Sequence, residues 1–461
     1  MNRRNLRTLL CACWLAVVYG SLPLKAAEKQ ETPAERGFRL LTTKAYLPPD
    51  FTPEIFSELW KRWPPALRDQ AAQATPEQRR AMAFDYYGLV EVPERGANGA
   101  PLGYVDNGQG GWAMNCLACH SGTVAGRAIL GVPNSNYALA DLISDVLHTK
   151  LRLKQPLGHM ELGSFTIPLG GSRGTTNAVV FGVALESFRD KDLVVHKEYP
   201  LQPLLHHDLD APPFWNVKKK THLYYDAFVK KGHRSLLQFI LLPRNGPETV
   251  KSWENDYRDI LAWIESLEPP AYPWPVNQPL ADAGQKIFDR QCAECHGTYG
   301  PQGSYPNRVL ALKEVGTDPL RLQALTPEYR RKYGESWLAH HDPSQVRPET
   351  PGYLAPPLDG IWASAPYLHN GSVPTLWHLF HPDQRPKVWQ RSKNGYDQQR
   401  VGLEVQTFDT PPPLPDGADE ATHERQFFNT QLRGKSSAGH TYPAQLTEPE
   451  RQAVLEYLKT L

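Results

Sequence analysis

Apolar residues recur at helical spacing in several separate stretches of this chain of 461 residues. Residues 51–90 carry one such stripe, and residues 259–267 and 452–461 carry two that resemble each other. Apolar positions three and four residues apart predict amphipathic helices. Thr447 and Glu450 have the spacing of a capping box, which predicts where the last helix begins. The pattern as a whole predicts a mostly α fold with long loops.

A proline-rich stretch interrupts this pattern in the middle of the chain. Residues 269–275 contain four prolines, too many for a helix, and predict a semi-rigid linker. Beyond it, Leu280, Ile287 and Phe288 fall on one helical face, and this helix runs into Cys292. We therefore divide the chain near residue 270.

The first residues have the pattern of a secretory signal. Arginines precede an apolar run over residues 9–19, and the small residues Ala26 and Ala27 follow it. This order predicts a signal peptide over residues 1–26 and hence a periplasmic or secreted protein. No other stretch reaches the 18 or so apolar residues that a membrane span needs, so we expect a mature chain that does not span the membrane.

Composition narrows the range of partners. The chain has 50 basic and 49 acidic residues, a balance that leaves no electrostatic footprint for nucleic acid and no strong attraction to an anionic membrane. It also has 43 prolines and 34 glycines, which predict much irregular backbone around short helices.

Two Cys-x-x-Cys-His motifs, residues 116–120 and 292–296, use every cysteine beyond residue 13. This spacing is the attachment signature of c-type haem, in which each thiol adds to one vinyl group and the histidine turns its imidazole toward the iron. We expect two covalently bound haem c groups, held by Cys116, Cys119, Cys292 and Cys295 and ligated by His120 and His296.

Other chemistry could use four cysteines. They could form two disulfides, or paired Cys-x-x-Cys units could hold zinc. Neither requires a histidine directly after both pairs, and both pairs have one here. Haem attachment therefore explains the motifs best. It predicts two cytochrome c-like haem domains in tandem, and we divide the chain into a signal peptide (1–26), an N-terminal helical extension (27–99), a first haem domain with inserted loops (100–270), a linker (271–279) and a second haem domain (280–461).

The sixth ligand of each iron decides what a haem can do, because a closed iron carries electrons and an open one can bind peroxide or dioxygen. The first haem has an open position or one of three nearby ligands, Met160, His148 or His159. No methionine follows Cys295, so the second haem has only histidines of its own half as candidates: His340, His341, His369, His378, His381, His423 and His440.

The segment 358–376, which contains Tyr367-Leu368-His369-Asn370-Gly371, carries a resemblance to a known family. Together with the two motifs in this order, it resembles the bacterial dihaem cytochrome c peroxidase superfamily, and most closely the rubber oxygenase-like branch of secreted dihaem cytochromes. The resemblance covers roughly residues 100–461. It implies that His369 is the distal ligand of the C-terminal haem, and that the haem of His120 is the active one.

Two further stretches of the sequence also resemble the rubber oxygenase-like branch. The glycine-rich stretch 171–178 allows close backbone approach, and Arg173 could pair with a haem propionate or make a surface ion pair. The segment 210–220 concentrates aromatic side chains, and Phe214 and Trp215 are candidates for the wall of an apolar substrate pocket, although core packing is the commoner role.

The expected function is an extracytoplasmic oxidoreductase that activates hydrogen peroxide or dioxygen at the N-terminal haem, while a bis-histidine C-terminal haem transfers or stores electrons. A small redox protein would donate electrons, and an apolar small molecule is a candidate substrate. Nothing in the sequence supports a bridging calcium ion. The alternative is a non-enzymatic electron-transfer cytochrome with both haems six-coordinate; a module that captures a small gas is a third.

Overall fold

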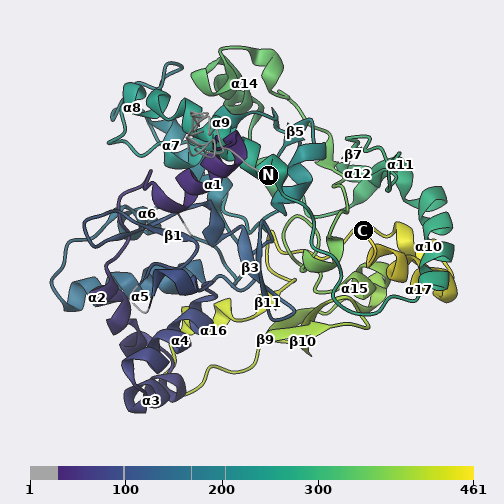
Figure 1. Cartoon of the computed structure of the whole chain (residues 1–461), viewed down its shortest axis with the longest axis horizontal. Coiled ribbons are helices and arrows are strands. Elements are labelled where there is room, and N and C mark those ends of the chain that lie inside the picture. The colour runs from purple at the N-terminus through teal and green to yellow at the C-terminus, as the bar shows by residue number, and fades with distance from the viewer. Residues whose placement is uncertain (1–29, 97–98, 168, 203) are drawn as a thin grey trace, which may run out of the picture. The chain divides into compact units, whose positions relative to one another are not determined.

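Figure 1 shows the computed structural model, which describes residues 30–96, 99–167, 169–202 and 204–461. The predicted signal peptide lies outside the described residues. Residues 33–461 form one compact unit, in which short helices and long loops surround five small antiparallel sheets. The predicted mostly helical fold with long loops is confirmed.

Four helices precede the first Cys-x-x-Cys-His motif: α1 (Pro33–Thr43), α2 (Pro53–Glu58), α3 (Pro65–Gln73) and α4 (Pro76–Tyr87). Each begins with proline, whose missing N–H is not needed in the first turn. Thr52 and Thr75 cap α2 and α4 by accepting backbone N–H bonds, and Thr75 forms a capping box with Gln78. The predicted helical character of residues 51–90 is confirmed.

Helix α1 packs against α9 (Glu254–Ser266), far along the chain. The two backbones meet at Gly37, where a Cβ atom would lie only 2.0 Å from the carbonyl oxygen of Asp259. The guanidinium of Arg36 pairs with the carboxylate of Asp259 at 2.5 Å. Helix α1 therefore packs on the helix that closes the first half, although it precedes residue 100.

The second half repeats this arrangement. Helix α10 (Gln278–Gln291) packs against α17 (Glu448–Leu458), and Figure 1 shows the two side by side. A Cβ atom on Gly284 would lie 1.9 Å from the carbonyl oxygen of Ala453. The backbone N–H of Thr447 donates to Glu450, so the predicted capping box is confirmed. Each half therefore ends with a helix that crosses an earlier helix at a glycine.

The remaining elements lie between these helix pairs. The first half contains β1 (Tyr104–Asp106), β2 (Trp112–Met114), β3 (Ser121–Val124), β4 (Arg127–Leu130), α5 (Leu139–Arg152), α6 (His159–Ser164), α7 (Ala178–Ser187), β5 (His222–Leu223), β6 (Val229–Lys230) and α8 (Pro247–Ser252). The second contains α11 (Ala293–His296), β7 (Val309–Ala311), α12 (Leu312–Val315), α13 (Leu320–Ala324), α14 (Pro327–Glu335), β8 (Gly352–Leu354), α15 (Leu376–Phe380), β9 (Val388–Asp397), β10 (Gly402–Phe408), α16 (Glu420–Arg425) and β11 (Phe428–Asn429). Strands pair as β1–β2, β3–β4, β5–β6, β7–β8 and β10–β9–β11.

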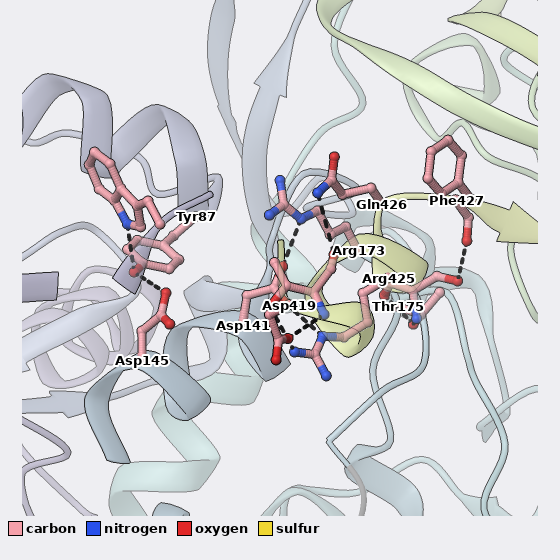
Figure 2. Close-up of polar contacts among 12 residues, drawn as sticks. Tyr87, Asp141, Asp145, Arg173, Thr175, Asp419, Arg425, Gln426 and Phe427 are labelled. Atoms are coloured by element: carbon pink, nitrogen blue, oxygen red, sulfur yellow. Dashed lines mark hydrogen bonds and ion pairs between the residues drawn. The ribbon is translucent and has the colours of Figure 1, made fainter. Parts of the chain in front are cut away.

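The parts of the chain before and after residue 270 contact each other directly. Helix α16 of the second half returns to α5 of the first, where Asp141 is buried between two guanidinium groups (Figure 2). Arg173 binds one oxygen of its carboxylate at 2.8 Å, and Arg425 binds the other at 2.6 Å. The linker itself packs on the second half, where the indole of Trp362 donates to the carbonyl of Pro270.

Candidate functional site

The first Cys-x-x-Cys-His motif forms a single tight turn. Asn115 caps the 3₁₀ helix Cys116–Ala118 by accepting the backbone N–H of Leu117 at 2.8 Å. The N–H of His120 then donates to the carbonyl of Cys116 at 3.1 Å, which closes a helical turn across the motif. Both cysteines are free thiols. The turn thus presents two thiols and one imidazole together, as haem c attachment requires.

The second motif has the same local geometry, approached by a helix instead of a hairpin. Helix α10 ends at Cys292, and the short helix α11 carries the motif to His296. The N–H of His296 donates to the carbonyl of Cys292 at 3.0 Å, the bond that also closes the first motif. Both of its cysteines are free thiols as well.

Each motif histidine is oriented by the carbonyl of a proline in an Ala-Pro-Pro triplet. Nδ1 of His120 bonds to Pro212 at 3.0 Å, and Nδ1 of His296 bonds to Pro356 at 2.8 Å. Because a carbonyl only accepts, Nδ1 carries the proton and Nε2 keeps its lone pair for a metal. The triplets at residues 211–213 and 355–357 are visible in the sequence. Their repetition was a signal that our sequence analysis missed.

Burial keeps both imidazoles neutral. It lowers the pKa of His120 to about 4, against a smaller opposing effect of the bond to Pro212. Burial also lowers the pKa of His296. A neutral imidazole is the form that ligates a metal ion, so both side chains are ready to bind iron near neutral pH.

The ring of His440 lies near the ring of His296. Their ring centres are 6.1 Å apart with an interplanar angle of 65°. An imidazole nitrogen binds a metal ion at about 2.0 Å, so two imidazoles on opposite sides of one ion have ring centres roughly 6 Å apart. Burial lowers the pKa of His440 to about 3, and its Nδ1 is buried with no hydrogen-bond partner among the described residues. The pair fits a six-coordinate haem iron.

His369, the ligand implied by the family resemblance, has a different environment. Its ring stacks on Tyr353 at 4.2 Å and meets the edge of Tyr225 at 6.1 Å. Its carbonyl accepts the N–H of Asp210. Of these two histidines, His440 is therefore the one whose ring contacts the ring of His296.

The other candidate histidines of the second half have partners of their own or lie at the surface. Nδ1 of His378 bonds to Thr375, His381 bonds to Trp377 and Glu448, and His423 bonds to Pro412. His340 and His341 are exposed.

Of the two predicted pocket-wall residues, Phe214 contacts His120 and Trp215 contacts another loop. Phe214 stacks on the ring of His120 with centres 3.9 Å apart, nearly parallel. Trp215 is completely buried, and its indole N–H donates to the carbonyl of Asp359 at 2.7 Å. Asp359 follows the second Ala-Pro-Pro triplet directly after Leu358. Trp215 therefore connects the loop that holds His120 with the loop that holds His296, a role that our sequence analysis did not assign.

The three candidates for the sixth ligand of the first haem have other neighbours. Met160 is buried and packs in an apolar cluster with residues of α2, α4 and α5. Nδ1 of His148 bonds to Ser144 on the exposed side of α5. Nε2 of His159 lies 3.6 Å from the carboxylate of Asp50. Arg173, the candidate for a propionate, pairs with Asp141 and lies over the ring of Tyr86.

Comparison with known proteins agrees with haem chemistry. Residues 352–390 match the RoxA-like, cytochrome c-like family. This segment contains Pro356 and His369, and it identifies a c-type cytochrome domain, which implies covalently bound haem c.

Two curated relatives come from Sinorhizobium fredii (strain NBRC 101917 / NGR234). The uncharacterized protein y4iM is 28% identical over 289 residues, which cover 54% of this chain and 64% of that protein. The uncharacterized protein y4iJ is 27% identical over 262 residues, covering 42% of this chain and 41% of that protein. The chain thus spans less than two thirds of the length of either relative.

A solved structure of Kuenenia stuttgartiensis hydrazine synthase aligns with 67% of this chain and 94% of its own, at 16% identity and a TM-score of 0.23. A score this low does not indicate a shared fold. Within the described residues, no helix has the length and apolar character to cross a membrane. The same residues contain no cluster of three or more His, Cys, Asp or Glu side chains that could hold a free metal ion such as calcium.

Proposed function

We propose that this chain is a dihaem c-type cytochrome that acts outside the cytoplasm as an oxidoreductase. The haem on His120 would bind hydrogen peroxide or dioxygen, and the haem between His296 and His440 would transfer or store electrons. Support for two haems comes from the duplicated arrangement: a helix pair crossing at a glycine, a Cys-x-x-Cys-His turn and a proline carbonyl on Nδ1 occur once in each half.

The different functions proposed for the two haems rest on a difference between the surroundings of His120 and His296. The ring of His296 lies 6.1 Å from that of His440, whereas among the described residues the ring that stacks on His120 is that of Phe214. Two imidazoles saturate an iron and suit it to electron transfer, while an iron with a vacant position can bind a small oxidant.

The chain's own groups would set up this chemistry. The carbonyls of Pro212 and Pro356 fix the tautomer and ring plane of the ligands and make Nε2 a stronger donor. Haem iron supplies the redox chemistry once it is bound. Trp215 lies between the two ligand loops as a completely buried indole, which makes it the best-placed side chain for electron exchange between the two halves.

Phe214 covers one face of the His120 ring, so it shields the proximal ligand from water. This contact does not support the expected role of Phe214 as the wall of a substrate pocket. A small redox protein remains our proposed electron donor, and the identity of any apolar substrate is open. The alternative function is a simple electron carrier in which the first iron also has two protein ligands.

The resting spectrum of the purified protein tests the proposal. We expect intact-mass measurement to show two haem groups, and electron paramagnetic resonance to show one high-spin and one low-spin ferric centre. Peroxide should perturb only the high-spin signal. Replacement of His120 should remove that signal, whereas replacement of His296 should remove the low-spin signal. Two low-spin centres that ignore peroxide would establish the electron carrier instead.

A further inference from the structure

Asp226 is a completely buried carboxylate that lies between two buried guanidinium groups. Arg321 binds its Oδ1 at 2.9 Å, and Arg330 binds its Oδ2. All three side chains are at most 2% exposed. This cluster therefore holds two positive charges and one negative charge in a region that water does not reach.

The two arginines differ in how fully their donors are used. Arg330 also donates through Nε to the carbonyl of Leu325 at 3.0 Å, and its guanidinium lies over the ring of Phe228. Arg321 bonds only through Nη2, and its Nε and Nη1 are buried without a partner among the described residues. The unmatched charge and the unmatched donors thus belong to Arg321.

No other acidic group in the described residues pairs with Arg321. Asp318 is close in sequence, but its carboxylate accepts the backbone N–H groups of Leu320 and Ser436. A buried guanidinium with unfilled donors is strongly unfavourable, because its hydration and its hydrogen bonds to water are both lost. Such a side chain indicates that an anion occupies the position when the protein is complete.

His207 lies near Arg321. Its Nδ1 bonds to the carbonyl of Leu205 at 2.8 Å, and its Nε2 is buried with no partner among the described residues. The side chains of Leu320 and His207 both approach Gly434, where a Cβ atom would lie 2.7 Å from the first and 3.8 Å from the second. Burial lowers the pKa of His207 to about 4, and the positive charge of Arg321 adds to this effect.

We propose that Arg321, with His207 beside it, binds a carboxylate that is brought either by a haem propionate or by a free organic acid. Arg321, Arg330 and Asp226 together carry one net positive charge, which matches a monoanion. The second haem is the candidate source of a propionate, because Tyr353, three residues before Pro356, donates a 2.6 Å hydrogen bond to the carbonyl of Asp318, three residues before Arg321. If the carboxylate is a haem propionate, this inference rests on the proposed function; if it belongs to a free organic acid, it does not.

Arg321→Gln and Arg330→Gln make a matched pair, since each removes one of the two guanidinium groups on Asp226. In the propionate form, Arg321→Gln should lower the haem content per chain or the midpoint potential of one haem, because a cation beside a propionate stabilises the ferrous state. Arg330→Gln should change neither, and Arg321→Lys, which keeps the charge, should retain most of the wild-type behaviour. Haem content and spectroelectrochemistry supply both readouts.

Acetate distinguishes the two sources of the carboxylate. If the site takes a free acid, acetate should raise the thermal midpoint of the wild-type holoprotein and of Arg330→Gln, and leave Arg321→Gln unchanged. If a propionate fills the site, acetate should have no such effect. The proposal is overturned if acetate has no effect on the wild type and the haem properties of Arg321→Gln match those of Arg330→Gln. A chain with fewer than two haems by mass would reject the proposed function, and the acetate response would still decide the role of Arg321.

Discussion

The indole N–H of Trp215 donates a 2.7 Å hydrogen bond to the carbonyl oxygen of Asp359. This bond joins the two loops whose prolines orient His120 and His296. Trp215 follows the triplet that orients His120, and Asp359 follows the triplet that orients His296. The neighbouring side chain of Asn216 makes a parallel bond to Pro357 at 2.9 Å. The relative position of the two imidazoles is therefore fixed by direct contacts between their own supporting loops.

Trp215→Phe should weaken this connection. The carbonyl of Asp359 would lose its donor in a buried position, and a lost buried hydrogen bond typically costs about 1–3 kcal/mol. We expect urea unfolding of the holoprotein to show that loss, and stopped-flow reduction to show slower electron exchange between the two haems. Trp274→Phe is the control, because Trp274 is only half-buried and stacks on Tyr396. Equal behaviour of the two variants would contradict the role of Trp215.

His440→Ala should convert the second haem from low-spin to high-spin, because it removes the imidazole that faces His296. His369→Ala is the matched control, since its ring contacts Tyr353 and Tyr225. We expect this variant to keep the low-spin electron paramagnetic resonance signal. The reverse result would restore His369 as the axial ligand and reject our reassignment.

The haem-attachment motifs could be predicted from the sequence. The residues that the fold brings to them from distant parts of the chain could not. The motifs at Cys116 and Cys292 are contiguous, so spacing alone identifies them. His440 was one of seven histidines that spacing could not rank, and only the packing of loops far apart in sequence brings its ring to His296. Helices α9 and α17 could be predicted, because each has a stripe of apolar residues that it buries.

The packing of α1 against α9 could not be predicted from the sequence for a related reason. Its partner α9 follows more than two hundred residues later, and the contact depends on the absence of a side chain at Gly37. A single glycine in a helical stretch carries little information by itself. Comparison with Gly284 in α10, which occupies the same position in the second helix pair, would have supplied the missing signal.

Gly284→Ala should destabilise the protein although alanine is the better helix former. Its Cβ would lie 1.9 Å from the carbonyl oxygen of Ala453, so α10 and α17 must separate. Forced separation of packed elements typically costs about 1–3 kcal/mol. Gly163→Ala in α6 is the control, since the nearest atom to its Cβ would be 3.8 Å away, and alanine there should be neutral or stabilising by up to about 1 kcal/mol. Urea unfolding monitored by helical circular dichroism compares the two.

Asp50→Asn should remove a pH dependence of stability. Asp50 is 1% exposed, its Oδ2 accepts the N–H of Met114 and its Oδ1 has no hydrogen-bond partner among the described residues. Burial raises its pKa from 3.8 to about 8, so the folded chain holds a proton that the unfolded chain releases, and stability falls as pH rises between these values.

His159 beside it has a pKa lowered from 6.5 to about 4 by burial, so above pH 6.5 it is mostly neutral in both states. Between pH 6.5 and 8 the wild type should therefore lose up to about 2 kcal/mol of unfolding free energy that Asp50→Asn retains, because the asparagine carbonyl still accepts from Met114 without ionising. Parallel pH profiles of the two proteins in urea unfolding would show that Asp50 is ionised at neutral pH, contrary to this expectation.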